Sequence, residues 1–446
     1  MTFNIYNLGC KVNSYESNVM SDLLKNKGYI EVKTDEVADI SIINTCSVTN
    51  QADNKSMKTI RHAIKISPNA IIVVCGCFSQ NKVEEAKNIL GVDIVIGNLY
   101  KTKIVSYIEK YLEEKKQIVD VYDISNISFE KMELNNFNKT RAFVKIQDGC
   151  NNFCTYCVIP YTRGNVRSKK REDVLLEVKN LIANGHQEIV LTGIHTGNYG
   201  VEFDNYDFAD LLNDLIKIDG LKRLRISSIE ITELNAKVLD VLKRSDILVD
   251  HMHIPLQSGS DTVLKRMNRK YDKEYFINKI NEIRTIRPNI SITTDVIVGF
   301  PGETEEEFAE TIETIKKVNF SKLHVFPYSK RDKTAAANLE NHIDPAIKKM
   351  RAKILINLSK ELEIDYMNKF VEEEVTFIPE IIKDDVLIGH TGNYLLIHTK
   401  GNIQDINKNI KVELKSVNYP YLEATKIDYL VKNWYYNVKW GILWEI

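Results

Sequence analysis

The sequence predicts an α/β protein with three successive folded parts: an N-terminal parallel α/β sheet, a central partial (β/α)6 TIM-like barrel and a small C-terminal β-barrel. Apolar strand-like runs alternate with amphipathic helix-like runs over residues 1–118, and the same alternation recurs over residues 136–366. Only short strand-like runs follow, over residues 367–430. Alternating strands and helices are typical of parallel sheets, whereas short strands separated by turn residues are typical of small barrels.

Length, charge and cysteine content narrow the protein class. The 446 residues suggest several domains, and 60 Lys and Arg nearly balance 61 Asp and Glu, so a nucleic-acid site must be a local patch. The first residues lack a signal-peptide pattern, and no apolar run is long enough to span a bilayer. Seven cysteines, clustered in short motifs, are typical of reduced thiols in a cytoplasmic protein rather than of a disulfide framework.

The first domain carries cysteines at the ends of its expected strands. We expect strands at residues 3–8, 38–44, 70–74 and 93–96, and helices at 14–27, 51–65, 79–90 and 101–115. Cys10, Cys46, Cys75 and Cys77 follow three of these strands. The carboxyl ends of parallel strands share one edge of the sheet, so three of these thiolates can converge there and bind an iron–sulfur cluster. This cluster would be additional to the one predicted below for the central domain. The alternative is that these cysteines are buried core residues. We assign Cys77, in the turn, as the third ligand beside Cys10 and Cys46, and Cys75 as buried in or beside the strand.

The central part begins after a polar, weakly periodic stretch, residues 119–139, which we interpret as a linker. Expected barrel strands are 141–147, 188–193, 221–227, 251–256, 291–299 and 322–327, with helices at 172–184, 208–218, 232–243, 273–287 and 305–318. Cys150, Cys154 and Cys157 follow the first strand with C-x3-C-x2-C spacing. Three thiolates on one loop can bind three irons of a cubane and leave the fourth iron open, whereas zinc requires a fourth nearby ligand. Incidental cysteines are the other alternative.

Polar residues near other strand ends suggest a cofactor pocket at the barrel mouth. Gly193 lets a ligand approach the backbone, Glu230 can accept hydrogen bonds from a ribose or an amino group, and Asp295 points into the barrel or outward. Together they favour a polar, nucleoside-like cofactor. The alternative is ordinary turn and capping chemistry, with His195 and His253 as structural histidines.

Two basic stretches are candidates for phosphate binding. One recurs at helical spacing and comprises Lys55, Lys58, Arg61, His62 and Lys65; the other, residues 163–171, is the densest basic stretch and follows the cluster loop. Both are either solvated surface or phosphate contacts, to RNA for the first stretch and to a phosphate-bearing substrate for the second. In the C-terminal barrel, we expect exposed His390 and Tyr394 to stack on bases. The aromatic end, residues 431–446, has no assigned role.

Several motifs carry a family resemblance. The loop from Cys150 to Cys157, including Tyr156, resembles the cluster loop of radical S-adenosylmethionine (SAM) enzymes. Seven further segments resemble the methylthiotransferases among them: residues 8–16, 44–46, 76–77, 160–164, 191–195, 255–260 and 299–304. Residues 389–396 are similar to the family's RNA-associated TRAM barrel. Residues 11–13 and 192–195 look most like the branch that acts on threonylcarbamoyladenosine in tRNA. The extra Cys75 and the end after about residue 430 depart from the pattern.

The resemblance implies a specific chemistry. Cys150, Cys154 and Cys157 would hold one [4Fe-4S] cluster that binds SAM for radical formation, and Cys10, Cys46 and Cys77 would hold a second that carries sulfur. Tyr156, Gly193, Glu230 and Asp295 are the expected SAM contacts. The expected product is the 2-methylthio derivative of N6-threonylcarbamoyladenosine at position 37, beside the tRNA anticodon. Residues 163–171 are then where we first expect the anticodon stem of that tRNA. A reductant and a sulfur donor would be partners. The alternatives are the same chemistry on isopentenyladenosine or a ribosomal protein, and a non-catalytic, zinc-containing RNA-binding protein.

Overall fold

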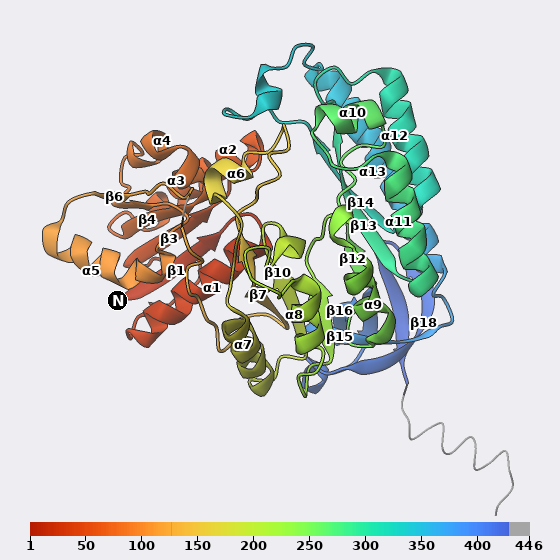
Figure 1. Cartoon of the computed structure of the whole chain (residues 1–446). Helices are drawn as coiled ribbons and strands as arrows, with labels where there is room; N and C mark the ends of the chain where they lie inside the picture. The colour runs from red at the N-terminus through yellow and green to blue at the C-terminus, as the bar shows by residue number, and fades with distance from the viewer. Residues whose placement is uncertain (126, 428–446) are drawn as a thin grey trace, which may run out of the picture. The chain divides into compact units, whose positions relative to one another are not determined.

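The computed structural model describes residues 1–125 and 127–427, which form two compact units (Figure 1). The first unit comprises Met1–Leu358, and the second begins at Ser359. No helix among the described residues is both long enough and apolar enough to cross a membrane.

A six-stranded parallel sheet forms the N-terminal part, in the order β2-β1-β3-β4-β5-β6. Its strands are β1 (Thr2–Asn7), β2 (Ile30–Glu31), β3 (Ile40–Thr45), β4 (Ile71–Gly76), β5 (Ile94–Ile96) and β6 (Ile118–Asp120). The predicted parallel α/β sheet is therefore confirmed. The sequence missed β2 and β6 because runs of two and three residues carry too little periodicity to be recognised.

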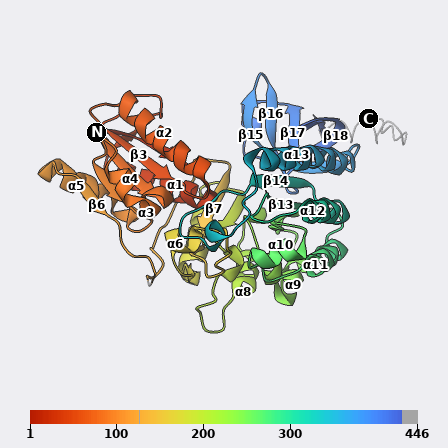
Figure 2. The same cartoon turned by 90° about the horizontal axis from the view of Figure 1, so that it is seen from above.

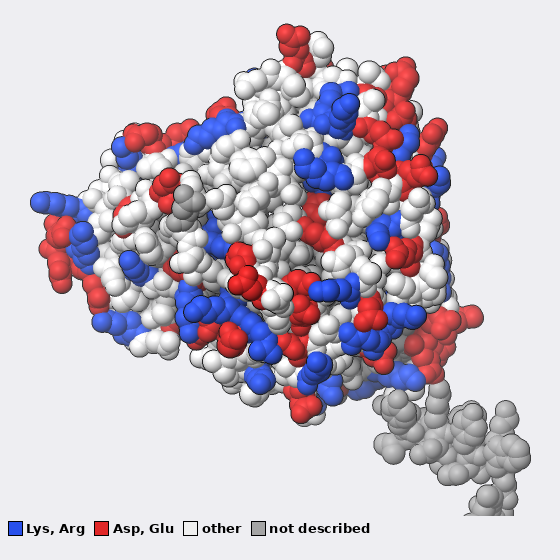
Figure 3. All heavy atoms as spheres, viewed as in Figure 1, with Lys and Arg blue, Asp and Glu red and all other residues white. Residues whose placement is uncertain are grey.

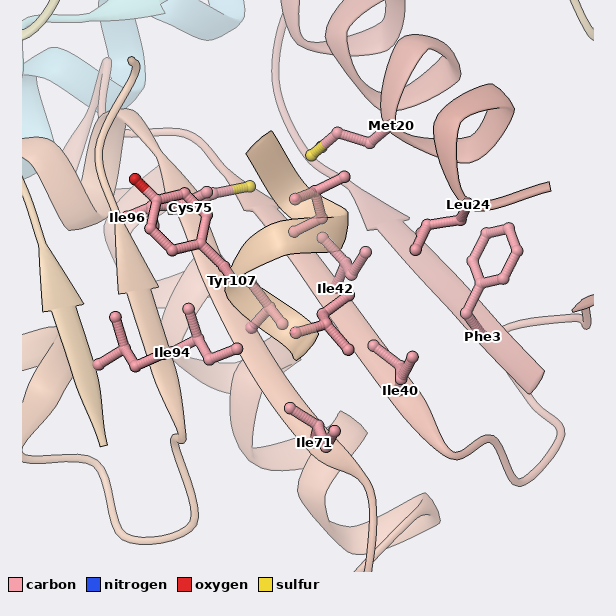
Figure 4. Close-up of a cluster of buried hydrophobic side chains, with 14 residues drawn as sticks. Phe3, Met20, Leu24, Ile40, Ile42, Ile71, Cys75, Ile94, Ile96 and Tyr107 are labelled. Carbon is pink, nitrogen blue, oxygen red and sulfur yellow. The ribbon is translucent and has the colours of Figure 1, made fainter. Parts of the chain in front are cut away.

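Helices cover both faces of this sheet, as Figure 2 shows from above. On one face α1 (Lys11–Asn26) and α5 (Ile104–Glu114) enclose a core that includes Phe3, Ile42 and Ile94 (Figure 4). The other face packs against α2 (Asn50–Ile66), α3 (Cys77–Asn81) and α4 (Val83–Lys87). The helix predicted over residues 79–90 is wrong in its continuity, because the chain leaves helical geometry at Lys82, where φ is −130° and ψ is 57°.

Six parallel strands form the open barrel, in two groups of three. One sheet has the order β11-β10-β7 and the other β12-β13-β14. The strands are β7 (Arg141–Lys145), β10 (Glu188–Thr192), β11 (Arg223–Ile226), β12 (His251–His253), β13 (Ser291–Val298) and β14 (Lys322–Pro327). Their helices are α7 (Arg171–Ala183), α8 (Phe208–Leu215), α9 (Ala236–Arg244), α11 (Lys273–Ile286) and α12 (Glu305–Val318). This confirms the predicted partial barrel.

Short elements connect the barrel and shape its mouth. They are β8 (Gln147–Asp148) paired with β9 (Arg167–Ser168), α6 (Ile159–Arg163), α10 (Asp261–Arg266) and the 3-10 turns η2 (Thr196–Asn198), η3 (Ile231–Glu233) and η4 (Ala335–Asn338). A further 3-10 turn, η1 (Lys101–Lys103), precedes α5 in the N-terminal part. The interpretation of residues 119–139 as a linker is wrong in one respect. Its first two residues end β6 and the rest that the structure describes is irregular, but Ile124, Met132, Leu134 and Phe137 are buried, so the segment is packed into the first unit.

A closed five-stranded barrel forms the second unit, as predicted. Following α13 (Pro345–Asn368), its strands are β15 (Glu374–Lys383), β16 (Val386–Thr391), β17 (Leu396–Lys400), β18 (Ile410–Asn418) and β19 (Tyr421–Lys426), with the turn η5 (Ile403–Asp405). Alternate side chains such as Phe377, Leu387 and Val412 fill its core. The aromatic end, residues 431–446, lies outside the described residues.

Candidate active site

The Cys150 loop folds back on itself and on neighbouring loops. The amide of Cys150 donates to the carbonyl of Gly164 at 3.0 Å, and the amide of Cys157 donates to the carbonyl of Cys154 at 2.9 Å. Burial, together with the nearby thiols of Cys154 and Cys150, raises the pKa of the Cys157 thiol to about 12, because like charges oppose ionisation. The three thiols are therefore close enough to interact electrostatically.

A cavity of about 240 Å³ lies beside this loop. It is lined by Asn152, Cys154, His195, Asn198, Glu230, Thr232, Glu233, Asn268, Arg269, Lys270 and Tyr271. The Arg269 guanidinium donates from Nη1 to Cys154 Sγ at 3.3 Å and from Nη2 to Glu230. The sequence prediction missed Arg269. Its one visible signal is that it belongs to a polar run, residues 268–271, directly after a short helix.

His195 is the second side chain that reaches a cluster-loop cysteine. Its Nδ1 lies 3.6 Å from Cys150 Sγ and 2.9 Å from Asn198 Nδ2, while Nε2 pairs with Glu233. Burial opposes protonation of this ring, but the hydrogen bonds with Cys150 and Glu233 outweigh it and raise the pKa to about 10. His195 therefore belongs to the wall of the cysteine site.

The four predicted SAM contacts lie in different surroundings. Glu230 lines the cavity together with Cys154. Tyr156 packs against a small apolar cluster. A Cβ atom on Gly193 would lie 2.9 Å from Gln147 Oε1. The Gln147 side chain therefore already occupies the space beside this glycine. The Asp295 carboxylate lies 3.3 Å from His253 Nε2 on the neighbouring strand.

The first domain brings Cys10, Cys46 and Cys77 together. Cys10 immediately precedes α1, Cys46 follows β3, and Cys77 begins α3. A Cβ on Gly9 (φ +97°) would lie 2.9 Å from Cys46 Sγ, so only glycine permits this approach. Burial raises the pKa of Cys46 to about 11, with Cys77 and Cys10 contributing.

Cys75 lies apart from these three cysteines. Its side chain is fully buried in the core between the sheet, α1 and α5 (Figure 4). Gly76 adopts φ +101°, and a Cβ there would lie 2.5 Å from the carbonyl oxygen of Thr45. The chain therefore turns sharply after Cys75, which brings Cys77 to the sheet edge and leaves Cys75 inside.

A buried ionic network connects the two cysteine sites. The Glu16 carboxylate lies 2.6 Å from Arg163 Nη1 and 2.7 Å from Lys145 Nζ, and it also pairs with Lys101. Arg163 Nη2 donates to Asn13 Oδ1 at 2.7 Å. Burial opposes ionisation of Glu16, yet its three cationic partners hold its pKa well below the usual value. We call Glu16, Lys101, Lys145, Asp148, Arg163 and Arg167 the buried ionic network.

The other end of this network lies beside the Cys150 loop. Asp148, two residues before Cys150, lies 2.7 Å from Lys145 Nζ, 2.9 Å from Arg167 Nη2 and 3.3 Å from Arg163 Nη1. On the other side, Asn98 Nδ2 donates to the Thr162 carbonyl at 2.7 Å and lies 3.5 Å from Cys77 Sγ. Residues 160–164 are therefore held between the two cysteine sites.

These contacts contradict the predicted role of residues 163–171 as an RNA surface. Arg163, Arg167 and Lys169 are 0%, 5% and 1% exposed and pair with buried carboxylates. Of the basic residues in this stretch, Lys170 and Arg171 are exposed. The prediction was wrong because clustered charges in a sequence do not reveal their carboxylate partners, which here are Asp148 and Glu177 of the same domain and Glu16 of the N-terminal domain.

The charge of the network fits an anionic cluster. Two carboxylates, Glu16 and Asp148, face four cations, so the buried network has an excess of two positive charges beside both cysteine sites. Buried positive charge of this kind favours thiolates. Among the described residues, no three His, Cys, Asp or Glu side chains are spaced to bind one metal ion. A cubane does not need that spacing, because each thiolate binds a different iron.

The other expected RNA contacts have a mixed outcome. All five basic residues of α2 are exposed. Their exposure is compatible both with a solvated helix face and with contacts to RNA phosphates. The expected exposure of His390 and Tyr394 is wrong, because both are half-buried, their rings 5.2 Å apart, and His390 contacts Glu380 at 2.5 Å. Figure 3 shows basic and acidic side chains interspersed over the face viewed, in keeping with the balanced composition.

Known families match both parts of the first unit. Residues 144–315 match the Radical SAM superfamily, and residues 2–97 match Uncharacterized protein family UPF0004. Among solved structures, the radical S-adenosylmethionine methyltransferase TsrM from Kitasatospora setae is similar in fold, with a TM-score of 0.56, 13% identity and coverage of 75% of this chain and 76% of that one.

Curated relatives match along almost the whole chain. Threonylcarbamoyladenosine tRNA methylthiotransferase MtaB from Bacillus subtilis is 45% identical over 95% of this chain and 96% of its own length. The protein of the same name from Aquifex aeolicus is 37% identical, with 91% and 98% covered. The tRNA-2-methylthio-N(6)-dimethylallyladenosine synthase of Clostridium tetani is also 37% identical, with 96% of each chain covered. The chain belongs to the methylthiotransferase family of radical SAM enzymes.

Proposed function

We propose that this enzyme adds a methylthio group to carbon 2 of N6-threonylcarbamoyladenosine at position 37 of tRNA. The observation that carries the proposal is the 45% identity, over 95% of this chain, with a threonylcarbamoyladenosine tRNA methylthiotransferase. The dimethylallyladenosine synthase relative has lower identity, 37%, at similar coverage. Membership of the radical SAM family implies a [4Fe-4S] cluster and SAM.

In this proposal the Cys150 site prepares SAM for cleavage. Cys150, Cys154 and Cys157 would hold a [4Fe-4S] cluster, which when bound supplies the electron that cleaves SAM reductively. Arg269, which donates to both Cys154 and Glu230, would keep the cavity wall aligned with the cluster loop. Glu230 would accept hydrogen bonds from SAM, and Tyr156, Gly193 and Asp295 remain predicted contacts.

A second [4Fe-4S] cluster would be held by Cys10, Cys46 and Cys77 and would provide the sulfur. Support comes from their mutual approach and from the positive charge of the buried ionic network beside them. The enzyme would work in the cytoplasm with the tRNA anticodon stem-loop, and it would need a reductant and a sulfur donor. Its own residues would hold the adenine between the two sites and exclude water.

Nucleoside mass spectrometry tests the substrate. In tRNA from a deletion strain, we expect the 2-methylthio form of threonylcarbamoyladenosine to disappear and the unmodified precursor to accumulate. Complementation with the wild-type chain should restore the 2-methylthio form of threonylcarbamoyladenosine, whereas complementation with a Cys10→Ala chain should not. Loss of the methylthio form of dimethylallyladenosine, which is the same nucleoside as isopentenyladenosine, would instead assign the enzyme to that substrate. Loss of a methylthio group from a ribosomal protein, seen by mass spectrometry of the protein, would assign it to the protein substrate.

Iron analysis tests the two clusters. After anaerobic reconstitution we expect about eight irons per chain, and about four after replacement of Cys10, Cys46 and Cys77 by alanine. The triple variant should still cleave SAM but make no methylthio product. A zinc-loaded, colourless wild-type protein without SAM cleavage would instead identify a non-catalytic RNA-binding protein.

A further inference from the structure

The segment that follows β14 contacts the loops of both cysteine sites. We call residues 329–336, which lead from β14 into η4, the β14 loop. Near its start, the Ser329 hydroxyl accepts a hydrogen bond from the amide of Asn50 at 3.0 Å. At its end, the amide of Ala336 donates to the carbonyl of Thr155 at 2.8 Å, and Thr155 belongs to the Cys150 loop. The β14 loop therefore joins the start of α2 in the N-terminal part to the Cys150 loop of the barrel.

Arg331 attaches the β14 loop to the residues that follow Cys46. Its side chain is 3% exposed, and Nη1 lies 2.8 Å from Asp53 Oδ2 while Nη2 donates to Ser47 Oγ at 2.9 Å. Ser47 directly follows Cys46, and its hydroxyl donates to Asp53 Oδ1 at 2.7 Å. Arg331, Asp53 and Ser47 thus contact one another in a buried triangle. Charge-assisted bonds from a planar guanidinium are directional, so this contact fixes orientation as well as distance.

The β14 loop is short and is held along its length. The Thr334 hydroxyl donates to the carbonyl of Arg331 at 2.7 Å, which closes a turn inside the loop. Ala336 is fully buried and packs in an apolar cluster with Phe300 and Tyr328. The chain from Arg331 to Ala336 spans at most about 18 Å even when fully extended. A displacement at one cysteine loop is therefore transmitted to the other.

The N-terminal cysteine site is attached to the barrel beside each of its three cysteines. The barrel partners are Arg163, through Asn13, beside Cys10; the Thr162 carbonyl, through Asn98, beside Cys77; and Arg331, through Ser47, beside Cys46. Thr162 and Arg163 are consecutive and follow β7, whereas the β14 loop leaves the other three-stranded sheet. Two adjacent points leave a rigid body free to tilt about them, and a distant third point removes that freedom. Arg331 is that third point.

We propose that the β14 loop sets the tilt of the N-terminal cysteine site toward the Cys150 site, with Arg331 as the positioning residue. This inference rests on the proposed function, in which sulfur from the first site must meet an adenine carbon activated at the second. Such a meeting depends steeply on alignment, since a displacement of about 1 Å can cost roughly 100-fold in rate. SAM cleavage takes place at the Cys150 site and does not need this alignment. Arg331 therefore controls the transfer of the methylthio group and not the cleavage of SAM.

The first test separates these two reactions. Reconstituted wild-type and Arg331→Met enzymes are compared on an anticodon stem-loop that carries threonylcarbamoyladenosine. In the variant we expect kcat for the methylthio product to fall roughly 10- to 100-fold, with KM for the stem-loop unchanged. Formation of 5′-deoxyadenosine from SAM without the stem-loop should be unchanged. An equal loss of SAM cleavage, or an unchanged kcat, would overturn the proposal.

Arg244→Met is the matched control. Arg244 pairs with Asp240 at 2.7 Å on the exposed surface of α9, so this variant also breaks an arginine–aspartate pair. It should change neither kcat nor SAM cleavage, because a surface pair of this kind contributes little to stability. A fall in kcat equal to that of Arg331→Met would show a general effect of losing an arginine and would overturn the proposal.

The second test measures the arrangement of the two sites without turnover. With both clusters reduced, electron paramagnetic resonance detects the magnetic dipolar coupling between them, which falls steeply with their separation. We expect one well-defined coupling in the wild-type and Arg244→Met enzymes and a broadened distribution in Arg331→Met. The same coupling in all three would show that Arg331 does not position the sites, and would overturn the proposal.

Arg331→Lys serves if Arg331→Met fails to fold or to bind iron. Lysine keeps the charge that faces Asp53 but loses the guanidinium that contacts Asp53 and Ser47 together. We expect about eight irons per chain, a kcat between those of the wild-type and Arg331→Met enzymes, and a broadened dipolar coupling. A fully loaded Arg331→Lys enzyme with wild-type kcat and coupling would overturn the proposal.

The results distinguish this proposal from the proposed function. A wild-type enzyme that modifies only a dimethylallyladenosine stem-loop would refute the proposed substrate, and a lower kcat of Arg331→Met on that stem-loop would still support the role of the β14 loop. About four irons per wild-type chain would refute the second cluster and this role together. A wild-type enzyme with about eight irons and the expected product, combined with an Arg331→Met enzyme of unchanged kcat, would refute the role of the β14 loop alone.

Discussion

Glu16→Gln is the sharpest test of the buried ionic network. Glu16 is fully buried and is the shared partner of Lys101, Lys145 and Arg163. Glutamine keeps the volume but leaves three buried cations around a neutral amide. Removal of one member of a buried ionic group typically costs about 3–5 kcal/mol, because the remaining charges lose compensation. We expect the free energy of unfolding of the first unit to fall by about that amount.

Urea denaturation of the reconstituted enzyme, followed by circular dichroism at the helical band, measures this loss. Tryptophan fluorescence is unsuitable because all three tryptophans lie beyond residue 430. Glu109→Gln is the matched control, since Glu109 pairs with Lys27 on the surface, and it should leave the midpoint unchanged. A double variant, Glu16→Gln with Lys101→Met, should recover part of the loss because one uncompensated cation is gone. A loss below about 1 kcal/mol for Glu16→Gln would refute the electrostatic argument.

Three further predictions follow from single features. Cys75→Ala should leave the iron content unchanged, whereas Cys77→Ala should remove about four irons per chain; iron analysis of both decides the assignment, and equal losses would contradict it. Neutralising Lys55 and Lys58 together should weaken tRNA binding and lower the slope of log affinity against log salt by about two if both contact phosphates; an unchanged slope, measured by filter binding, would show a solvated face. Arg266 and Thr262 lower the pKa of Glu307 to about 2, so its carboxylate stabilises the fold above its unfolded pKa near 4.5, and this contribution is lost as pH falls toward 2. Glu307→Gln should therefore flatten the acid limb of the curve of Tm against pH, and an unaltered limb would contradict this.

Strand and helix periodicity predicted most of the architecture. An apolar run such as residues 70–74 is recognisable because its strand is buried on both faces. The strands β2 and β6 were missed because pairing with the neighbouring strand, rather than their own pattern, makes them strands. The break at Lys82 was missed because a local departure from helical geometry leaves the apolar spacing almost intact.

The cysteine sites were more predictable than their surroundings. Spacing alone predicted the Cys150 loop as a cluster site, and strand-end position favoured Cys77 over Cys75, which the structure places in the core of the sheet. Arg269 and Glu233 were not identified, because each reaches the site from a different loop after more than 70 residues of intervening chain. Arg163 was misinterpreted for the same reason, since its partner Glu16 lies on α1. A lysine inside an otherwise apolar strand, Lys145, was the available signal of a buried ion pair.

Exchange of N-terminal domains between relatives is constrained by the buried ionic network. The segment after β6 suggests a natural point at which to join one domain to another barrel. Yet Glu16 on one side of that junction compensates Lys145 and Arg163 on the other. A chimera, or a barrel expressed alone from about residue 136, would carry buried cations without their carboxylate. The N-terminal domain and the barrel therefore have to be inherited together. Recombination between genes of this family succeeds only where the N-terminal domain retains the glutamate and the barrel retains the lysine and arginine that pair with it.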